Sequence, residues 1–164
     1  MLILGLDPGS LHTGYGVVEK HGSTLAMRES GRISCRRDLP LPARLAQLAR
    51  RAAELVAQWR PDLAAVESPF HGLNPRSLIV LAQARGALLA AVAGAGVEVI
   101  EYTPAEVKSA IAGNGRADKE QVAHMLALLL AFPGRPAHDA TDALAVAVCC
   151  AHRLRLDRLR HAVK

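Results

Sequence analysis

The sequence predicts a single α/β domain, and two patterns carry that prediction. Short apolar runs, typical of buried strands, alternate with longer segments whose apolar residues recur every three or four positions, as in amphipathic helices. The chain has 164 residues, of which 51% are hydrophobic, so it is long enough for one domain with a sizeable core. Two of the apolar runs end in a carboxylate, and these strand ends are the first candidates for chemistry.

The first apolar run, residues 2–6, leads directly into Asp7 and a Pro-Gly turn. Such a run is typical of a strand that is buried on both faces of a sheet. Pro8 supplies no N–H to a strand ladder and Gly9 accepts dihedral angles that other residues resist, so we expect the strand to stop at Asp7. The Asp7 carboxylate then either points out of the end of the sheet or caps the turn, and the sequence leaves both roles open.

Four further strands and five helices are expected along the chain. Residues 13–18 resume a strand pattern close enough to the first strand to return antiparallel beside it. The other strands are expected at residues 24–34, 63–67 and 97–101, and the helices at 43–60, at 75–93, after Thr103, after Asp118 and from about Asp139. Capping residues or a first-turn proline at three of these helix starts support the assignment.

The composition favours a soluble, cytoplasmic protein with a polyanionic partner. Lys and Arg number 20 against 15 Asp and Glu, and surplus cations attract phosphate backbones at long range. The 3 cysteines form no Cys-x-x-Cys pair and no even-numbered framework, which argues against disulfides and structural zinc and favours a reducing compartment. The longest apolar tract, residues 78–96, is interrupted by Gln83, Arg85 and several glycines, so no membrane span is expected.

Four acidic residues form the candidate site. Asp7 and Glu67 end two strands, whereas Asp139 and Asp142 lie three positions apart at the start of the last expected helix and so share one of its faces. Acids in a first helical turn are also favoured by the helix dipole, and Asp139 could be an N-cap, so a purely structural role stays open for that pair taken alone.

The four acids taken together predict a metal site. They supply oxygen donors without thiolates or a histidine cluster, and such donors suit Mg²⁺ or Mn²⁺. Carboxylates that converge repel one another, so their convergence makes physical sense if divalent cations neutralise them. Two ions about 3.5–4 Å apart could activate a water and stabilise the leaving oxygen of a phosphodiester. The pattern therefore indicates metal-dependent phosphodiester hydrolysis.

Five other residues are candidates for contacting DNA: Phe70, Arg76, Lys108, Arg116 and Lys119. Phe70 is an aromatic residue on an expected loop, outside any periodic stripe, so it could stack on a base or pack in the core. Lys108 and Lys119 occupy early helical positions, and Arg116 ends a glycine-rich basic loop. All three could meet phosphates, or could be solvated charges on the surface.

The chain resembles RuvC-type Holliday-junction resolvases from Met1 to about Arg153. The resemblance rests on five ordered motifs: LGLDPGS with TGYG (residues 4–10 and 13–16), VESPF (66–70), QARG (83–86), ADKEQV (117–122) and DATDALA (139–145). It implies a ribonuclease H-like fold, with a mixed five-stranded sheet flanked by helices. This nuclease domain would span residues 1–153, followed by a basic C-terminal tail, residues 154–164, that could fray.

The resemblance also implies an activity and partners. Asp7, Glu67, Asp139 and Asp142 would be catalytic, metal-binding residues that hold two Mg²⁺ ions, with Mn²⁺ able to substitute. A homodimer would make paired symmetric nicks in four-way DNA junctions during recombination and repair, alongside the branch-migration proteins RuvA and RuvB. Phe70 would contact junction bases, and Lys108 and Lys119 would lie near phosphates. After Phe70 the chain departs from the pattern, because His71-Gly72-Leu73 stands where such proteins often have an aromatic and a basic residue.

Other functions compete with this interpretation. A ribonuclease H-like nuclease that cuts RNA–DNA hybrids would use the same acids, and only substrate tests separate the two. A non-catalytic junction-binding module would explain the charge and Phe70 but not four converging acids. An actin-like ATPase opens with a similar strand and turn, but it needs two such domains around a cleft.

The long helix expected at residues 75–93 is predicted to form the dimer contact. Its residues 78–82 are apolar around almost the whole circumference, so a sheet cannot cover all of them. We expect Leu78 or Leu81 to point outward and residues 87–93 to pack on the sheet. A four-way junction has approximate two-fold symmetry, which an isologous dimer would match.

Overall fold

The protein is built around a mixed five-stranded sheet. The computed structural model describes residues 1–68, 74–131 and 138–162, except for the side chains of residues 138, 139 and 155–162. The strands are β1 (Leu2–Asp7), β2 (His12–His21), β3 (Thr24–Ser34), β4 (Leu63–Glu67) and β5 (Glu98–Tyr102), in the spatial order β3-β2-β1-β4-β5. The first three strands pair antiparallel, whereas β1, β4 and β5 run parallel. The expected mixed five-stranded sheet is confirmed.

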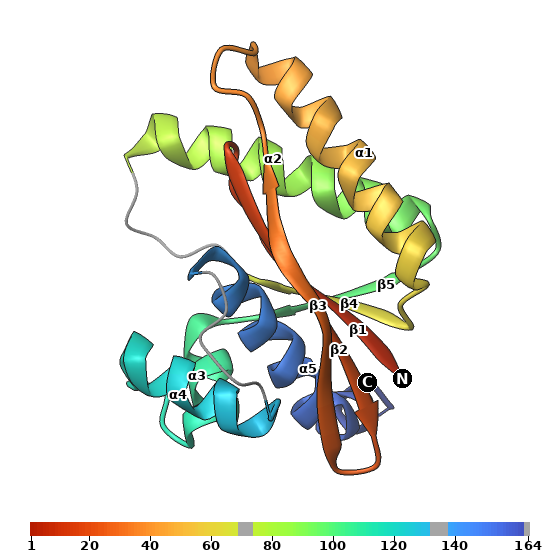
Figure 1. Cartoon of the computed structure of the whole chain (residues 1–164), viewed down its shortest axis with the longest axis vertical. Coiled ribbons are helices and arrows are strands. Elements are labelled where there is room, and N and C mark those ends of the chain that lie inside the picture. Colours follow the sequence, from red (N-terminus) through yellow and green to blue (C-terminus); the bar gives the residue numbers. More distant parts are fainter. Residues whose placement is uncertain (69–73, 132–137, 163–164) are drawn as a thin grey trace.

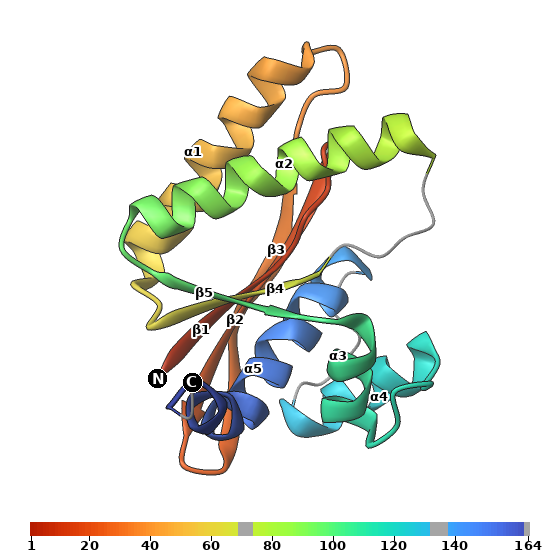
Figure 2. The ribbon, with the colours of Figure 1, turned by 180° about the vertical axis from the view of Figure 1, so that it is seen from behind.

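Helices cover both faces of this sheet. They are α1 (Leu41–Trp59), α2 (Pro75–Gly94), α3 (Pro104–Ala112), α4 (Lys119–Leu129) and α5 (His138–Ala162). Figures 1 and 2 show α1 and α2 on one side of the sheet, and α5 on the other side with α3 and α4 beside it. Each face has its own cluster of buried apolar side chains, so the sheet is the wall between two cores.

Local signals explain most of the helix starts. The Asn74 side chain accepts a hydrogen bond from the Ser77 N–H at 2.9 Å and caps α2. Reciprocal capping boxes begin the next two helices, Thr103 with Glu106 at α3 and Asp118 with Gln121 at α4. The sequence predicted all three starts correctly because capping depends only on residues three positions apart.

Several boundaries differ from the prediction, and the ends of β2 and α1 are shifted by up to three residues. Strand β5 covers Glu98–Tyr102, one residue later than expected, because its register is set by pairing with β4. Helix α5 continues to Ala162, so most of the segment predicted as a tail is helical backbone. The division of the chain into a domain and a tail at residue 153 stays a prediction.

Glycines bring α5 into contact with the backbone of the sheet. A Cβ added to Gly5 of β1 would lie 2.0 Å from the Ala143 carbonyl oxygen of α5. A Cβ added to Gly16 of β2 would lie 2.6 Å from Leu144 Cδ2. Real Cβ atoms do not approach other atoms so closely, so only glycine at these two positions allows α5 to lie where it does. The backbone of α5 therefore lies directly against the backbone of β1 at Gly5.

Helix α2 is only partly covered. Its buried residues are Ala84, Arg85, Leu88 and Val92, none of them in its first nine residues, whereas Ile79 near the start is 60% exposed. Leu78 and Leu81, which we expected to point outward, are half-buried, so Ile79 is the outward residue instead. By length and composition, α2 is the one helix in the described part that could cross a membrane, with mean hydropathy 1.6 and 22% of that window buried.

Candidate functional site

The two strand-end acids lie side by side. Strands β1 and β4 are parallel neighbours, and their register pairs Leu6 with Val66. Asp7 and Glu67 are the next residues of the two strands, so they lie level with each other. Successive side chains of a strand point to opposite faces. Leu6 and Val66 belong to the core under α1 and α2, so the side chains of Asp7 and Glu67 point to the face that α5 covers.

A buried threonine closes the turn that follows Asp7. The Thr13 hydroxyl donates to the Gly9 carbonyl oxygen at 2.8 Å and accepts from the Gly9 N–H at 3.2 Å. Thr13 is 0% exposed, so both bonds are shielded from water. Thr13 belongs to a motif seen in the sequence, but its role as the clamp of this turn became visible only in the structure.

Helix α5 delivers the second pair of acids to the same face. Asp142 directly precedes Ala143, whose carbonyl oxygen lies against Gly5 of β1. The glycine contact therefore fixes Asp142 near the end of β1. Asp139 lies one turn earlier in the same helix, and its side chain is outside the described part.

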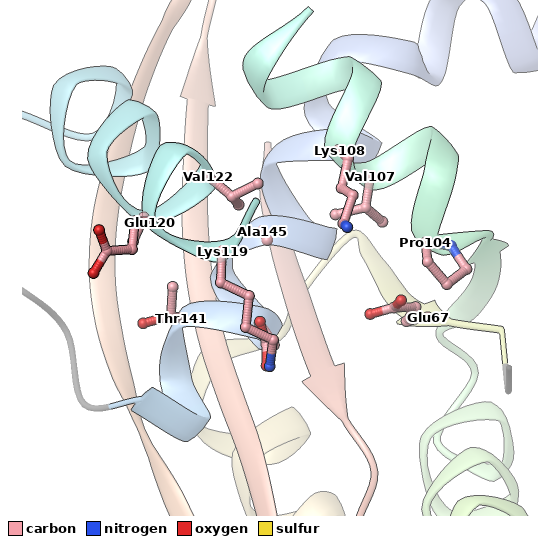
Figure 3. Close-up of a pocket in the computed structure, with 11 residues that line it drawn as sticks. Glu67, Pro104, Val107, Lys108, Lys119, Glu120, Val122, Thr141 and Ala145 are labelled. Carbon is pink, nitrogen blue, oxygen red and sulfur yellow. The ribbon is translucent and has the colours of Figure 1, made fainter. Parts of the chain in front are cut away.

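A cavity of about 440 Å³ opens between α3, α4 and α5 at this edge of the sheet. Among its lining residues are Glu67, Asp142, Lys108 and Lys119. Figure 3 shows Glu67 and Lys108 turned toward the same opening, with the Lys119 side chain crossing from α4 toward α5. The Lys119 Nζ lies 3.8 Å from Asp142 Oδ2. Two predicted acids and two predicted cations thus share one opening.

The surroundings of Glu67 disfavour its charged form. Burial raises the pKa of the Glu67 carboxyl, and the nearby Asp142 carboxylate raises that pKa further. Lys108 and Lys119 act in the opposite direction on the same pKa, through their positive charges. Glu67 is therefore a partly desolvated carboxylate with both a like charge and opposite charges around it, an environment common at functional sites.

The donor set fits a hard divalent cation in its chemistry. The three described carboxylates, Asp7, Glu67 and Asp142, supply only oxygen atoms and converge on one face and one edge of the sheet. In the described part of the chain, no three His, Cys, Asp or Glu side chains lie close enough to hold an ion together. The side chains would have to turn toward one another, and Asp139 would have to add the fourth carboxylate.

The other candidate residues are placed differently. Arg76 is exposed in the first turn of α2, and Arg116 lies in the turn between α3 and α4, so neither lines the cavity. Phe70 lies outside the described residues, and its predicted role is untested. Sequence reasoning gave no role to Arg85, a buried residue of α2 that lies behind Glu67.

The fold and the site define a class of protein. The sheet has the order β3-β2-β1-β4-β5, and β2 alone runs opposite to the other four strands. Such a sheet, with acids at the ends of β1 and β4 and at the start of a helix packed on β1, is the ribonuclease H-like arrangement. Divalent ions held by acidic residues can cleave a phosphodiester by in-line displacement. The chain is therefore a nuclease of the ribonuclease H-like class.

Comparison with known proteins identifies the family. The family model for the crossover junction endodeoxyribonuclease RuvC matches residues 3–150. A protein of that name from Alkalilimnicola ehrlichii is 49% identical over 98% of this chain and 97% of its own length. Another from Cupriavidus pinatubonensis is 48% identical over 93% of this chain and 84% of its own. The chain belongs to the RuvC family of crossover junction endodeoxyribonucleases.

Solved structures agree with this assignment. The structure of Thermus thermophilus RuvC matches with a TM-score of 0.88 and 34% identity, over 96% of this chain and 97% of that one. The same protein in complex with a Holliday-junction substrate matches with a TM-score of 0.90 and 33% identity, over 96% of both chains. The yeast mitochondrial resolvase Ydc2, at 14% identity and a TM-score of 0.67, shares the fold.

Proposed function

We propose that this chain resolves four-way DNA junctions by paired symmetric nicks, with Asp7, Glu67, Asp139 and Asp142 as the catalytic, metal-binding residues. The observation that carries the proposal is the convergence of strand-end and helix-start acids beside two lysines in one opening. The Thermus relative bound to a Holliday junction supports the choice of substrate. Lys108 and Lys119 supply positive charge for an anionic backbone, and Glu67 and Asp142 supply oxygen donors for a cation in the same opening.

Nucleases of this family depend on a metal, and we assign the ion as Mg²⁺, with Mn²⁺ able to substitute and two ions at each site. Hard oxygen donors favour these ions over zinc. When bound, such ions supply an activated water and neutralise charge on the leaving oxygen. The acids themselves hold the ions on the α5 side of the sheet, at the ends of β1 and β4.

The cations around the opening would hold the DNA backbone. Lys108 and Lys119 line the cavity with Glu67, so a phosphate that reaches the acids also meets their ammonium groups. Arg76 and Arg116 are placed farther along the surface, on α2 and on the α3–α4 turn, where they could contact the junction arms. Phe70 would stack on a base next to the cut.

We propose that two copies of the chain pair through the exposed part of α2. Ile79 is 60% exposed on a helix of mean hydropathy 1.6, which is costly for a protein that remains monomeric in water. A two-fold dimer would cover this surface and present two sites to a two-fold junction. A cytoplasmic location, no membrane association and cooperation with RuvA and RuvB complete the proposal, supported by the family and by three buried cysteines.

The test compares substrates and one acid variant. Wild type and Asp7→Asn are incubated with a mobile four-way junction, plain duplex and an RNA–DNA hybrid, each with Mg²⁺ and with chelator. We expect wild type to cut the junction only with Mg²⁺, and Asp7→Asn to bind the junction equally but to cut at least about 1,000-fold more slowly, because a metal ligand is lost while the cations remain.

Controls separate this proposal from its alternatives. Asp38→Asn makes the same change at an exposed acid that pairs with Arg36, and it should cut like wild type. Preferential cutting of the hybrid would instead indicate a nuclease that reads the 2′-hydroxyl. Junction binding without any cutting would indicate a non-catalytic module.

A further inference from the structure

Arg85 is a buried charge for which the catalytic acids give no direct explanation. It is 8% exposed, and Thr13 and Arg85 are the two buried polar or charged residues of the described chain. Thr13 closes the turn after one strand-end acid, Asp7. Burying a guanidinium is costly unless it is paired and hydrogen-bonded, so the partners of Arg85 indicate its role.

Both partners of Arg85 lie at the ends of the parallel strands. Its Nη1 donates to the backbone carbonyl oxygen of Glu67 at 3.2 Å, and its Nη2 lies 2.7 Å from Glu101 Oε2. Val66, next to Glu67, is paired in register with Glu101. The planar guanidinium therefore joins the end of β4 to β5, and the direct bond from Ser68 N–H to the Tyr102 carbonyl at 2.7 Å ties the same ends one residue further on.

Arg85 reaches Glu67 from behind the site. Helix α2 packs on the face of the sheet that holds Val66 and Val99. The Glu101 side chain points to this face as well, because it is two residues from Val99 on the same strand. The Glu67 side chain points to the opposite face, toward α5. Arg85 thus holds the backbone of Glu67 without occupying its carboxylate, which stays available to the site.

Stability alone is a weak reason for this arrangement. A buried ion pair often contributes no more to stability than apolar residues of the same volume would. Leu88 and Val92 of the same helix are fully buried in that core, so an apolar residue would suit the position. The guanidinium instead donates from Nη1 to a backbone carbonyl oxygen and forms an ion pair with Glu101 through Nη2, an arrangement that sets the position of that carbonyl.

We propose that Arg85 is a positioning residue for Glu67, and that it ties the metal-binding end of β4 to α2, the helix through which the protein pairs. The inference rests on the proposed function, because it takes Glu67 to be a metal ligand. The inference adds that the position of Glu67 in each protomer depends on the position of α2. Groups that hold ligating carboxylates in place commonly change metal affinity when they are removed.

The test measures metal binding without DNA. Mn²⁺ is titrated calorimetrically into wild type, Arg85→Met and Arg85→Lys, and junction affinity and the Mg²⁺ midpoint of cleavage are measured on the same preparations. We expect Arg85→Met to weaken Mn²⁺ binding and raise the Mg²⁺ midpoint by about 10–100-fold, with junction affinity unchanged. Arg85→Lys should lie between the two, because an ammonium keeps the charge but lacks the planar guanidinium that reaches both partners.

A matched control separates positioning from general destabilisation. Val56→Ala removes buried volume from α1 near the start of β4, at the opposite end of that strand from Glu67. It should lower the melting temperature without changing the Mn²⁺ affinity. The inference is overturned if Arg85→Met binds Mn²⁺ like wild type, or if Val56→Ala weakens Mn²⁺ binding equally at equal loss of stability.

Two further variants keep the outcome decisive. If Arg85→Met fails to fold, Glu101→Gln replaces it, since the Glu101 side chain is 51% exposed and the change keeps its size. Weaker Mn²⁺ binding then supports the inference, and unchanged binding overturns it. Glu67→Gln should abolish Mn²⁺ binding at its site. A wild type that binds Mn²⁺ through Glu67 but cuts no junction would contradict the proposed function and leave the Arg85 comparison valid.

Discussion

The two faces of the sheet are packed by different means. On one face the backbone of α5 touches Gly5 and packs against Gly16, and small side chains fill the contact, since Ala143, Ala147 and Ala151 are all 0% exposed. On the other face, long side chains such as Leu48 and Leu88 separate the helices from the sheet. A helix whose backbone meets a strand has little room to adjust, whereas packing through long side chains tolerates small adjustments.

The difference corresponds to what each face does. The face that α5 covers carries Asp7, Glu67 and Asp142, the described members of the proposed metal site, and metal ligands must be held close to their working positions. The other face carries α2, whose first half leaves Ile79 exposed, where we propose that a second copy pairs. The proposed site and the proposed contact surface therefore lie on opposite faces of the sheet, and the bond from Arg85 to the Glu67 carbonyl connects α2 with the end of β4.

The largest effect is expected from Gly5→Ala. The added Cβ would meet the Ala143 carbonyl oxygen at 2.0 Å, and backbone cannot rotate away as a side chain can. We expect a loss of at least about 3 kcal/mol of unfolding free energy and loss of cleavage, because α5 must move and take Asp142 with it. Urea unfolding and a nicking assay measure both effects.

The control for that experiment is Gly94→Ala at the end of α2, where a Cβ would meet nothing within 4 Å. It should change stability by less than about 1 kcal/mol, in the stabilising direction, because alanine is the better helix former. Equal destabilisation by the two substitutions would show that the faces do not differ as described.

A smaller effect is expected from Ile79→Glu. If α2 pairs with its own copy, a charge at this position should weaken the dimer by about 2–4 kcal/mol, because it is buried without a partner. Sedimentation velocity should show a folded monomer that nicks one strand and accumulates singly nicked junction on a cruciform plasmid. Leu88→Glu, at a position 0% exposed, should unfold the domain instead. A wild type that is monomeric at micromolar concentration while cutting both strands would contradict the pairing.

Phe70→Ala tests the segment that joins the two faces, because residue 70 follows β4, which carries Glu67, and precedes α2. We expect cutting to slow by about 1–3 kcal/mol in activation free energy, with binding less affected, since base stacking is worth that much. Phe70→Tyr retains the ring and should restore cutting. Unchanged cutting by Phe70→Ala, with a lower melting temperature, would assign Phe70 to the core.

The smallest effect concerns a polar pair on the α1 face. Burial, followed by the hydrogen bond to Glu29, raises the pKa of Tyr15 to about 12. Because the folded pKa exceeds the unfolded value of about 10, the neutral phenol adds stability below about pH 10, and this contribution is lost as the pH rises toward about 12. Urea unfolding from about pH 8 to about pH 11.5 should therefore show wild type losing stability more steeply than Tyr15→Phe. Parallel curves would contradict the assigned pKa.

Much of this protein follows from the sequence alone. The ends of β1 and β4, the caps of α2, α3 and α4, and the oxygen-donor chemistry of the acids depend on residues within a few positions of one another. Such local rules act before distant parts of the chain meet, so the sequence states them directly. The family motifs then predicted the mixed sheet and the activity of the class.

Tertiary structure decided the features that depend on distant residues meeting. Two contacts join elements that are far apart in the chain: Gly5 meets Ala143, and Arg85 binds Glu67 and Glu101. The exposure of Ile79 likewise depends on how α2 packs on the rest of the domain. The apolar pattern of a helix predicts that part of its surface is buried, but it does not identify the residue that faces outward. Which residue faces outward depends on the angle at which α2 crosses the sheet. The sequence likewise does not show why a strand residue is glycine, because the reason depends on which element packs against it. At Gly5 that element is the backbone of α5.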